Sequence, residues 1–247
     1  MRVHTRILLI ALLMIVVAPR ATPQYEMPKG NVPYDGRFQL IRLEYTSGYV
    51  GWLFDYAWME EHLMTMFDEL TSVRIARKGS NILRMDDPEL MKWPVAYLSE
   101  PGYWYVNTRE AAGLRNYLKK GGFLIVDDFY EGSRQPEWQT FDMSIHRVLP
   151  DAKIFPLELS NPIFDSFFRI KTIKDIPYPG NGYQWIKAQF YGIYEDNDPK
   201  KRLMVVINYD TDLGDYMEWS GSGLWPVNLS NDAYKFAMNY IFYGLAF

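Results

Sequence analysis

The segment Gly121-Gly122-Phe123-Leu124-Ile125-Val126-Asp127-Asp128 combines a glycine turn, an apolar strand and two carboxylates. A strand that is apolar on both faces belongs in the middle of a sheet that helices cover on both sides. In such sheets, ligands bind beyond the carboxyl ends of the strands. Asp127 and Asp128 therefore stand where an α/β protein keeps its functional residues.

The residues before this segment predict alternating strands and helices. Strands are expected at 38–45, briefly at 73–76, and at 95–99, with a helix from Asp55, read as its cap, to about residue 72. Asn107 and Glu110 resemble a capping box at the start of a second helix, which Gly121 or Gly122 ends. Strand, helix and strand with such short joints form a βαβ unit.

The residues after it predict a different arrangement. We expect a helix at 137–149, strands at 185–194 and 203–208 joined by a polar turn, an acidic loop at 210–218, and a closing helix at about 232–243. The predicted fold is α/β with three layers, α/β/α, around a mainly parallel sheet, and it ends in an antiparallel hairpin near the C-terminus.

The N-terminus predicts export. Arg2 and Arg6 precede an apolar run over residues 7–17, and small residues follow it. This order is typical of a signal peptide, and the run is shorter than the roughly 20 residues that a membrane span needs. We expect a signal at 1–21, an extended lead-in at 22–37 and one domain at 38–247. An uncleaved anchor is the alternative, and only then would the protein contact a membrane.

Composition narrows the partners and the chemistry. Cleavage after residue 21 leaves 23 basic and 30 acidic residues, a net charge of −7. An acidic chain without a basic cluster is a poor candidate for nucleic acid. The chain has no cysteine, which excludes disulfides, thiolate nucleophiles and cysteine-bound metals. From the predicted signal peptide we expect the protein to be periplasmic or otherwise extracytoplasmic.

Several short motifs occur in a distinctive order. They are Asp-Asp-Pro-Glu-Leu at 86–90, Tyr-Leu-Ser at 97–99, Leu-x-x-Tyr-Leu-x-x-Gly-Gly-Phe-Leu-x-x-Asp-Asp at 114–128, Asn-Pro-Ile-Phe at 161–164 and Asp-Leu-Gly-Asp at 212–215. Together they resemble the exported bacterial domain-of-unknown-function family numbered 4159, over nearly all of residues 38–247. The resemblance implies a flavodoxin-like core similar to class I glutamine amidotransferases, and it implies no established reaction.

The residues argue against glutaminase chemistry. In amidotransferase-like proteins the central strand leads to a Cys or Ser nucleophile that a His activates. Here the corresponding positions hold Asp127, Asp128 and Phe129. His62 and His146 both lie in helical patterns, where a structural role is expected.

The strand-end carboxylates are the main candidates for a site. Asp127 and Asp128 are the catalytic candidates, and Asp128 with Asp215 could bind a hard cation or a polyhydroxyl ligand, or divide into an acid and a base. The alternative is structural, because strand-end Asp residues also accept backbone N–H bonds. Strand alternation predicts that Asp127 and Asp128 point to opposite sides.

Two further groups of residues are candidates for binding. Asp210, Asp212 and Asp215 lack the order and the final Glu of a calcium loop, so we expect a solvated acidic turn, no metal and no cofactor. Tyr103, Trp104 and Tyr105 follow a strand end, where their rings could stack on a sugar or a partner protein or could simply cover the core.

The predicted function is therefore an exported binding or scaffold domain of the bacterial cell envelope. Its partner would be an envelope protein or a polar or carbohydrate ligand. The alternatives are a hydrolase that acts on carbohydrate or another polar envelope component through Asp128 and a second carboxylate, and a structural subunit of an envelope assembly.

Overall fold

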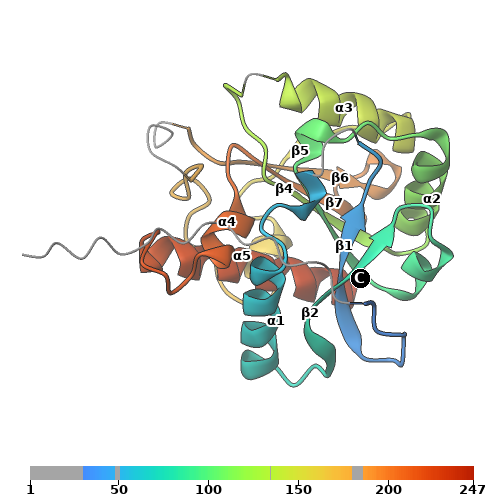
Figure 1. Ribbon diagram of the computed structural model, residues 1–247. Coiled ribbons are helices and arrows are strands. Elements are labelled where there is room, and N and C mark those ends of the chain that lie inside the picture. The colour runs from blue at the N-terminus through green and yellow to red at the C-terminus, as the bar shows by residue number, and fades with distance from the viewer. Residues whose placement is uncertain (1–29, 48–50, 134, 180–185) are drawn as a thin grey trace, which may run out of the picture.

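A computed structural model describes residues 30–47, 51–133, 135–179 and 186–247, and the predicted signal lies outside them. These residues form a seven-stranded sheet in the order β2-β1-β3-β4-β7-β6-β5 (Figure 1). The strands are β1 (Phe38–Glu44), β2 (Ile75–Arg84), β3 (Val95–Ser99), β4 (Phe123–Asp127), β5 (Phe155–Pro156), β6 (Gln189–Tyr194) and β7 (Leu203–Tyr209). The pairs among β1, β2, β3, β4 and β7 are parallel, and β6 runs antiparallel to β7. The flavodoxin-like α/β prediction and its C-terminal hairpin are confirmed.

Helices cover both faces of the sheet (Figure 1). They are α1 (Trp58–Leu70), α2 (Thr108–Lys119), α3 (Glu137–Val148), α4 (Leu213–Glu218) and α5 (Val227–Ala246), with short 3-10 turns η1 (Gly51–Leu53), η2 (Pro88–Lys92), η3 (Pro101–Tyr103), η4 (Pro162–Asp165) and η5 (Glu195–Asn197). Helices α2 and α3 contact each other, and α1, α4 and α5 form a second contacting group. Within the described residues, none of the helices combines the length and apolar character that crossing a bilayer requires.

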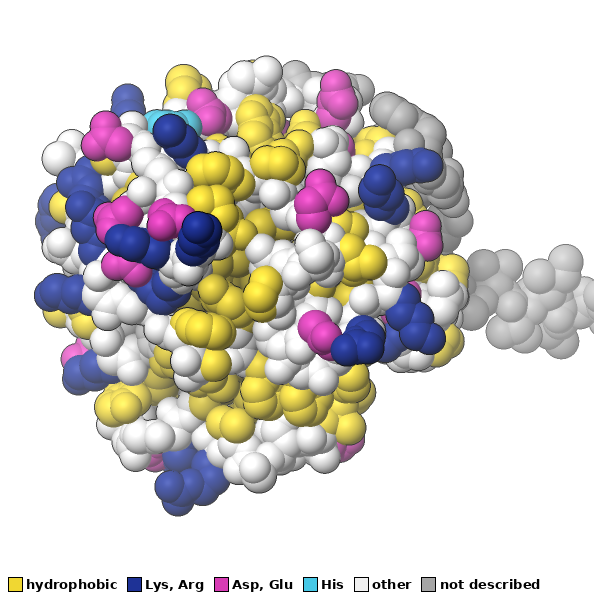
Figure 2. Space-filling view, turned by 180° about the vertical axis from the view of Figure 1, so that it is seen from behind, with side chains coloured by type: hydrophobic (Ala, Val, Ile, Leu, Met, Phe, Trp, Pro, Cys, Tyr) yellow, Lys and Arg dark blue, Asp and Glu magenta, His cyan; other side chains and the backbone are white. Residues whose placement is uncertain are grey.

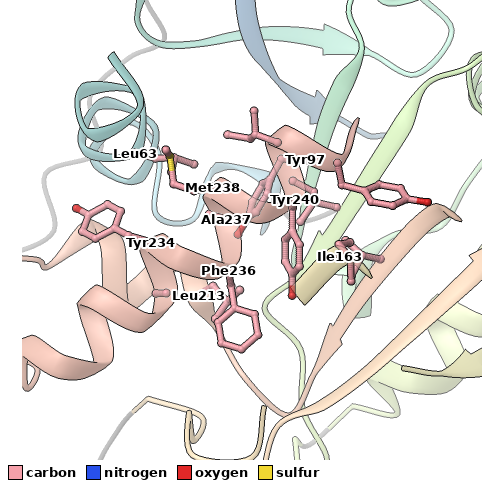
Figure 3. Close-up of a cluster of buried hydrophobic side chains, with 14 of the residues drawn as sticks. Leu63, Tyr97, Ile163, Leu213, Tyr234, Phe236, Ala237, Met238 and Tyr240 are labelled. Carbon is pink, nitrogen blue, oxygen red and sulfur yellow. The ribbon is translucent and has the colours of Figure 1, made fainter. Parts of the chain in front are cut away.

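Strand β4 lies at the centre of the sheet and is buried throughout. Phe123 and Ile125 belong to the core cluster with α1 and α5, whereas Leu124 and Val126 belong to the cluster with α2 and α3. Figure 3 shows the first cluster, in which residues of α5 meet Leu63, Tyr97 and Leu213 from other elements. The apolar run that predicted a central strand thus divides its side chains between two cores.

Local signals explain how β4 is positioned. Helix α2 starts with the predicted capping box, in which the Asn107 side chain accepts the Glu110 N–H and the Glu110 side chain accepts the Asn107 N–H. Gly121 follows the helix with a φ of 111°, a conformation that glycine adopts without steric cost. The chain therefore turns within a few residues from α2 into β4.

Three sequence predictions were wrong. Strand β2 is ten residues long and not a short strand at 73–76. It is an edge strand, and the lead-in covers it, since Asn31 donates to the Ile82 carbonyl and Asn81 accepts the Val32 N–H. Because side-chain hydrogen bonds with the lead-in cover its outer edge, β2 lacks the apolar sequence pattern by which a strand is recognised. The predicted loop at 210–218 contains α4, and the closing helix begins at Val227.

Candidate functional site

An acidic pocket lies at the carboxyl edge of the sheet. It has a volume of about 250 Å³. Its lining residues are Phe54, Asp55, Glu100, Asp128, Tyr178, Pro179, Asp212, Asp215 and Trp225. Asp55 follows β1 and Glu100 follows β3, two neighbouring strands from which the chain proceeds to opposite sides of the sheet. Such a switch point is where open α/β sheets bind ligands.

Asp128 reaches this pocket because β4 has ended. The strand stops at Asp127, and Asp128 adopts a left-handed conformation with a φ of 68°. Its Oδ1 accepts a hydrogen bond of 3.0 Å from the Tyr178 hydroxyl, and its Oδ2 lies 3.4 Å from the Ser99 hydroxyl. Burial, followed by the charges of Asp55 and Asp127, raises the pKa of Asp128 well above its usual range.

Asp127 holds the framework of the pocket. Its Oδ2 accepts hydrogen bonds from the Tyr97 hydroxyl at 2.7 Å and from the N–H groups of Leu213 and Gly214 at 3.0 Å. Its Oδ1 accepts one from Asn208 at 2.9 Å. Burial raises its pKa to about 6, although these hydrogen bonds act in the opposite direction. Asp127 thus fixes the first turn of α4.

Three further carboxylates meet beside Asp128. One oxygen each of Asp55, Asp212 and Asp215 lies within 4.8 Å of the others. Burial, followed by the charge of Asp215, raises the pKa of Asp55 well above its usual range, and burial with the Asp128 charge does the same for Asp212. Burial raises the pKa of Asp215 to about 6. The shared cause is burial, and neighbouring negative charges add to it at Asp55 and Asp212.

Two glutamates extend the acidic character of the site. Burial and the charge of Asp128 raise the pKa of Glu100 to about 10. Burial and the charge of Asp215 raise the pKa of Glu218, which lies one turn further along α4, to about 7. Each group therefore holds a proton more firmly than it would in water.

The buried Arg42 is paired with a carboxylate outside the pocket lining, although its charge also lowers the pKa of Asp55. Arg42 is fully buried, forms an ion pair with Glu60, and donates from Nη1 to the carbonyls of Trp52 and Phe54. It therefore fixes the loop that carries Asp55 and does not enter the pocket lining. Figure 2 shows a different surface, on which most Asp and Glu side chains lie singly or beside a Lys or Arg and hydrophobic side chains form a central band.

The family model for the domain of unknown function DUF4159 matches residues 39–245. The chain belongs to this family. No curated protein matches the chain. The matched range contains all the motifs quoted above, and similarity to glutamine amidotransferases stays a prediction.

The pocket of this DUF4159 domain contains two of the residues singled out from the sequence. Asp128 and Asp215 both line it, and Asp127 lies behind them as a structural anchor. Asp127 and Asp128 thus differ in role, and strand alternation does not apply to them as a pair because Asp128 lies beyond the end of the strand in a left-handed conformation.

The three aromatic candidates do not lie in this pocket. Trp104 is fully buried in the core beside α3, and Tyr103 packs against the same cluster. Tyr105 is 56% exposed, but it is absent from the pocket lining. The aromatic side chains that do line the pocket are Phe54, Tyr178 and Trp225.

The acidic turn is buried and not solvated. Asp210 accepts hydrogen bonds from the Glu131 N–H at 2.7 Å and from the Gln189 amide at 2.6 Å, which turns it away from the pocket. Asp212 caps α4 by accepting the Asp215 N–H at 2.8 Å. The expectation of a solvated turn failed because the short helix α4 could not be recognised in the sequence.

Sequence reasoning missed Asp55, Glu100 and Tyr178. Asp55 was read as a helix cap, but α1 begins at Trp58 with Ala57 in the capping position and no side-chain cap. Asp55 instead has a φ of 62°, and its carboxylate enters the pocket. The position of Glu100 directly after a parallel strand was a signal that could have identified it, whereas Asp55 lies beyond η1, well past the end of β1, and carries no such signal.

Proposed function

We propose that this chain is an exported binding or scaffold domain of the bacterial cell envelope that holds a polar ligand in the acidic pocket. The convergence of Asp55, Glu100, Asp128, Asp212 and Asp215 on one pocket at the switch point of the sheet carries the proposal. Carboxylates accept hydrogen bonds from hydroxyl groups and attract cations. Tyr178 and Trp225 add ring faces suited to a carbohydrate or an organic cation.

The surroundings of the histidines support a function other than glutaminase. His62 contacts the Met217 carbonyl, and His146 contacts the carbonyls of Asp142 and Ala152. Both rings are engaged with backbone groups outside the pocket lining. Purified protein is therefore expected to release no ammonia from glutamine above a heat-killed control. Release that Asp128→Asn abolishes would contradict this expectation.

A carboxylate-dependent hydrolase is the second candidate. The raised pKa of about 10 at Glu100 keeps a proton available at neutral pH, whereas Asp215, with a pKa of about 6, is largely ionised. Two carboxyl groups in different protonation states on one pocket form the division of roles that acid–base hydrolysis uses. A third candidate is a structural subunit of an envelope assembly, for which the pocket would have no role.

One capture experiment separates these functions. Immobilised wild-type protein, Asp128→Asn and Asp210→Asn are incubated with solubilised native envelope, and bound proteins and glycans are identified by mass spectrometry. Asp210 is a matched control because it is also a buried, left-handed Asp at a strand end, but it lies outside the pocket.

The binding proposal predicts capture by the wild type and Asp210→Asn and loss in Asp128→Asn. Equal capture by all three would remove the pocket from the function and favour the structural subunit. New reducing ends in a captured glycan, dependent on Asp128, would favour the hydrolase.

A further inference from the structure

The carboxylates of Asp55, Asp212 and Asp215 have the spacing of ligands on one ion. Their nearest oxygens lie within 4.8 Å of one another. Two oxygens on opposite sides of a Ca²⁺ ion are about 4.6–5.2 Å apart, and adjacent ones are closer, because Ca–O distances are about 2.3–2.6 Å. The three groups therefore already stand at separations that one ion can bridge.

An unpartnered buried atom at the same place is an independent observation. The Oδ2 atom of Asp55 is buried and has no hydrogen-bond partner. It lies against Gly214, where a Cβ would come within 2.5 Å of it, so only glycine leaves room for this carboxylate. A buried carboxylate oxygen without a donor or a cation is costly. This atom thus has no N–H or O–H donor, and the Asp55 carboxyl lies beside the Glu218 carboxyl, with which it can form a hydrogen bond only if one of the two holds a proton.

The described residues of the pocket wall supply no positive partner. Among the described residues that line the pocket there is no Lys, Arg or His. Arg42 lies outside the lining and bonds to Glu60 and two backbone carbonyls, and its charge lowers the pKa of Asp55 less than burial and the charges of Asp215 and Glu218 raise it. The charges of this cluster are therefore relieved either by protons, one of which Asp55 can share with Glu218, or by a bound cation. An all-oxygen donor set selects hard divalent cations and disfavours the softer transition metals.

We infer that Asp55, Asp212 and Asp215 form a binding site for a hard divalent cation, Ca²⁺ or Mg²⁺. The site deepens the proposed function, because the ion lies in the same pocket and can bridge the carboxylates to an oxygen-rich ligand. Ions of this class complete their coordination with water or ligand oxygens. The inference names the missing positive charge and leaves the identity of the larger ligand open.

The framework around the three ligands is fixed by other residues. Arg42 fixes the loop before Asp55 through the carbonyls of Trp52 and Phe54. Asp127 fixes the start of α4 through two backbone N–H groups. Asp212 uses Oδ1 to accept the Asp215 N–H, which orients the Asp212 side chain. An ion would therefore enter a site whose ligands are already positioned.

The test is calorimetric titration of the full chain, freed of metal with a chelator and dialysed, with CaCl₂ and in parallel with MgCl₂. Extracellular calcium modules bind at about 10⁻⁴ to 10⁻³ M, so titration to about 10 mM covers the relevant range. The wild type and Asp210→Asn should bind one ion per chain and gain thermal stability with it. Asp55→Asn should lose at least tenfold in affinity and, without metal, should melt at an equal or higher temperature because it removes an uncompensated charge.

The outcomes keep the two proposals apart. Absence of heat and of a melting shift with both ions would overturn the cation site, and so would unchanged affinity in a folded Asp55→Asn. If envelope capture is equal in chelator and in Ca²⁺ or Mg²⁺, the cation site has no part in the function, and the proposed binding function still stands. Ion binding without any pocket-dependent capture would overturn the proposed function and leave the cation site intact. The ion with the higher affinity identifies which of the two the site prefers.

Discussion

Asp127 offers the most direct test of how the pocket is built. Its carboxylate accepts four buried hydrogen bonds, from Tyr97, Asn208, Leu213 and Gly214. Asp127→Ala removes every acceptor and leaves these donors without partners. Asp127→Asn retains one oxygen, which can replace Oδ2 and keep the three bonds made there, while its amide nitrogen faces the Asn208 donor, so the Asn208 bond is lost in both variants. The two variants are both uncharged, so the cost of burying the charge cancels between them.

The expected difference follows from the three retained bonds. Each is worth about 1 kcal/mol in net stability, so Asp127→Asn should be more stable than Asp127→Ala by about 3 kcal/mol. For a domain of this size, roughly 2–4 °C of melting temperature corresponds to 1 kcal/mol, which gives a gap of about 6–12 °C. Loss of the anchor should also loosen the first turn of α4 without unfolding the sheet.

Urea denaturation and amide hydrogen exchange measure both effects. In Asp127→Ala the amides of Leu213 and Gly214 should exchange faster than in Asp127→Asn. Amides of α2, which Asp127 does not contact through a hydrogen bond, serve as the internal control. Equal stability of the two variants within about 1 kcal/mol, the net worth of a single hydrogen bond, with unchanged exchange at α4, would refute the role of Asp127 as the anchor.

Three further expectations concern charge and processing. In chelator, Asp128→Asn should melt at an equal or higher temperature because it removes a buried charge and keeps its hydrogen bond to Tyr178. Asp210→Asn should instead lose about 1–3 kcal/mol of stability because its amide would face the Gln189 donor. A clear fall in the melting temperature of Asp128→Asn in calorimetry would contradict this. The pKa of Glu100 rises from 4.5 to about 10 on folding, so the folded state holds the proton more firmly than the unfolded state. The free energy of unfolding in chelator should therefore fall as pH rises through that window. Urea denaturation at several pH values measures this, and a free energy of unfolding that rises with pH would contradict it. Mass spectrometry of the native protein should place the mature N-terminus near residues 19–22, and an intact Met1 in the membrane pellet would favour the anchor.

The fold was predictable where local signals agreed with tertiary structure. The apolar run of β4, the capping box of α2 and the polar turn between β6 and β7 each specify an element from neighbouring residues alone. Strand β2 could not be predicted in full because it is an edge strand. Its outer side bonds to Asn31 and Val32, about fifty positions earlier in the chain, which no local pattern reports.

The site was predictable only in part, for a related reason. Asp128 follows the central strand, so its location at the carboxyl edge followed from the fold. Asp55 looked like a helix cap because local spacing cannot reveal that the chain turns its side chain inward before α1 begins. The difference between Asp210 and Asp212, which lie two positions apart, depends on hydrogen bonds from distant Gln189 and Glu131.

The left-handed backbone at four acidic residues near the carboxyl edge of the sheet has a consequence for mutational scanning. Asp55, Glu100, Asp128 and Asp210 all have positive φ values, between 51° and 68°. Side chains other than Asn, Asp and Gly are strained there, at a cost of order 1–3 kcal/mol. An alanine scan would therefore report Asp55, Asp128 and Asp210 as sensitive, including Asp210 outside the pocket, whereas the native Glu100 already carries this strain. If only Asn and Gly are tolerated at an Asp position, the left-handed backbone explains its sensitivity. The difference between Asp and Asn at that position then measures what the carboxylate itself contributes.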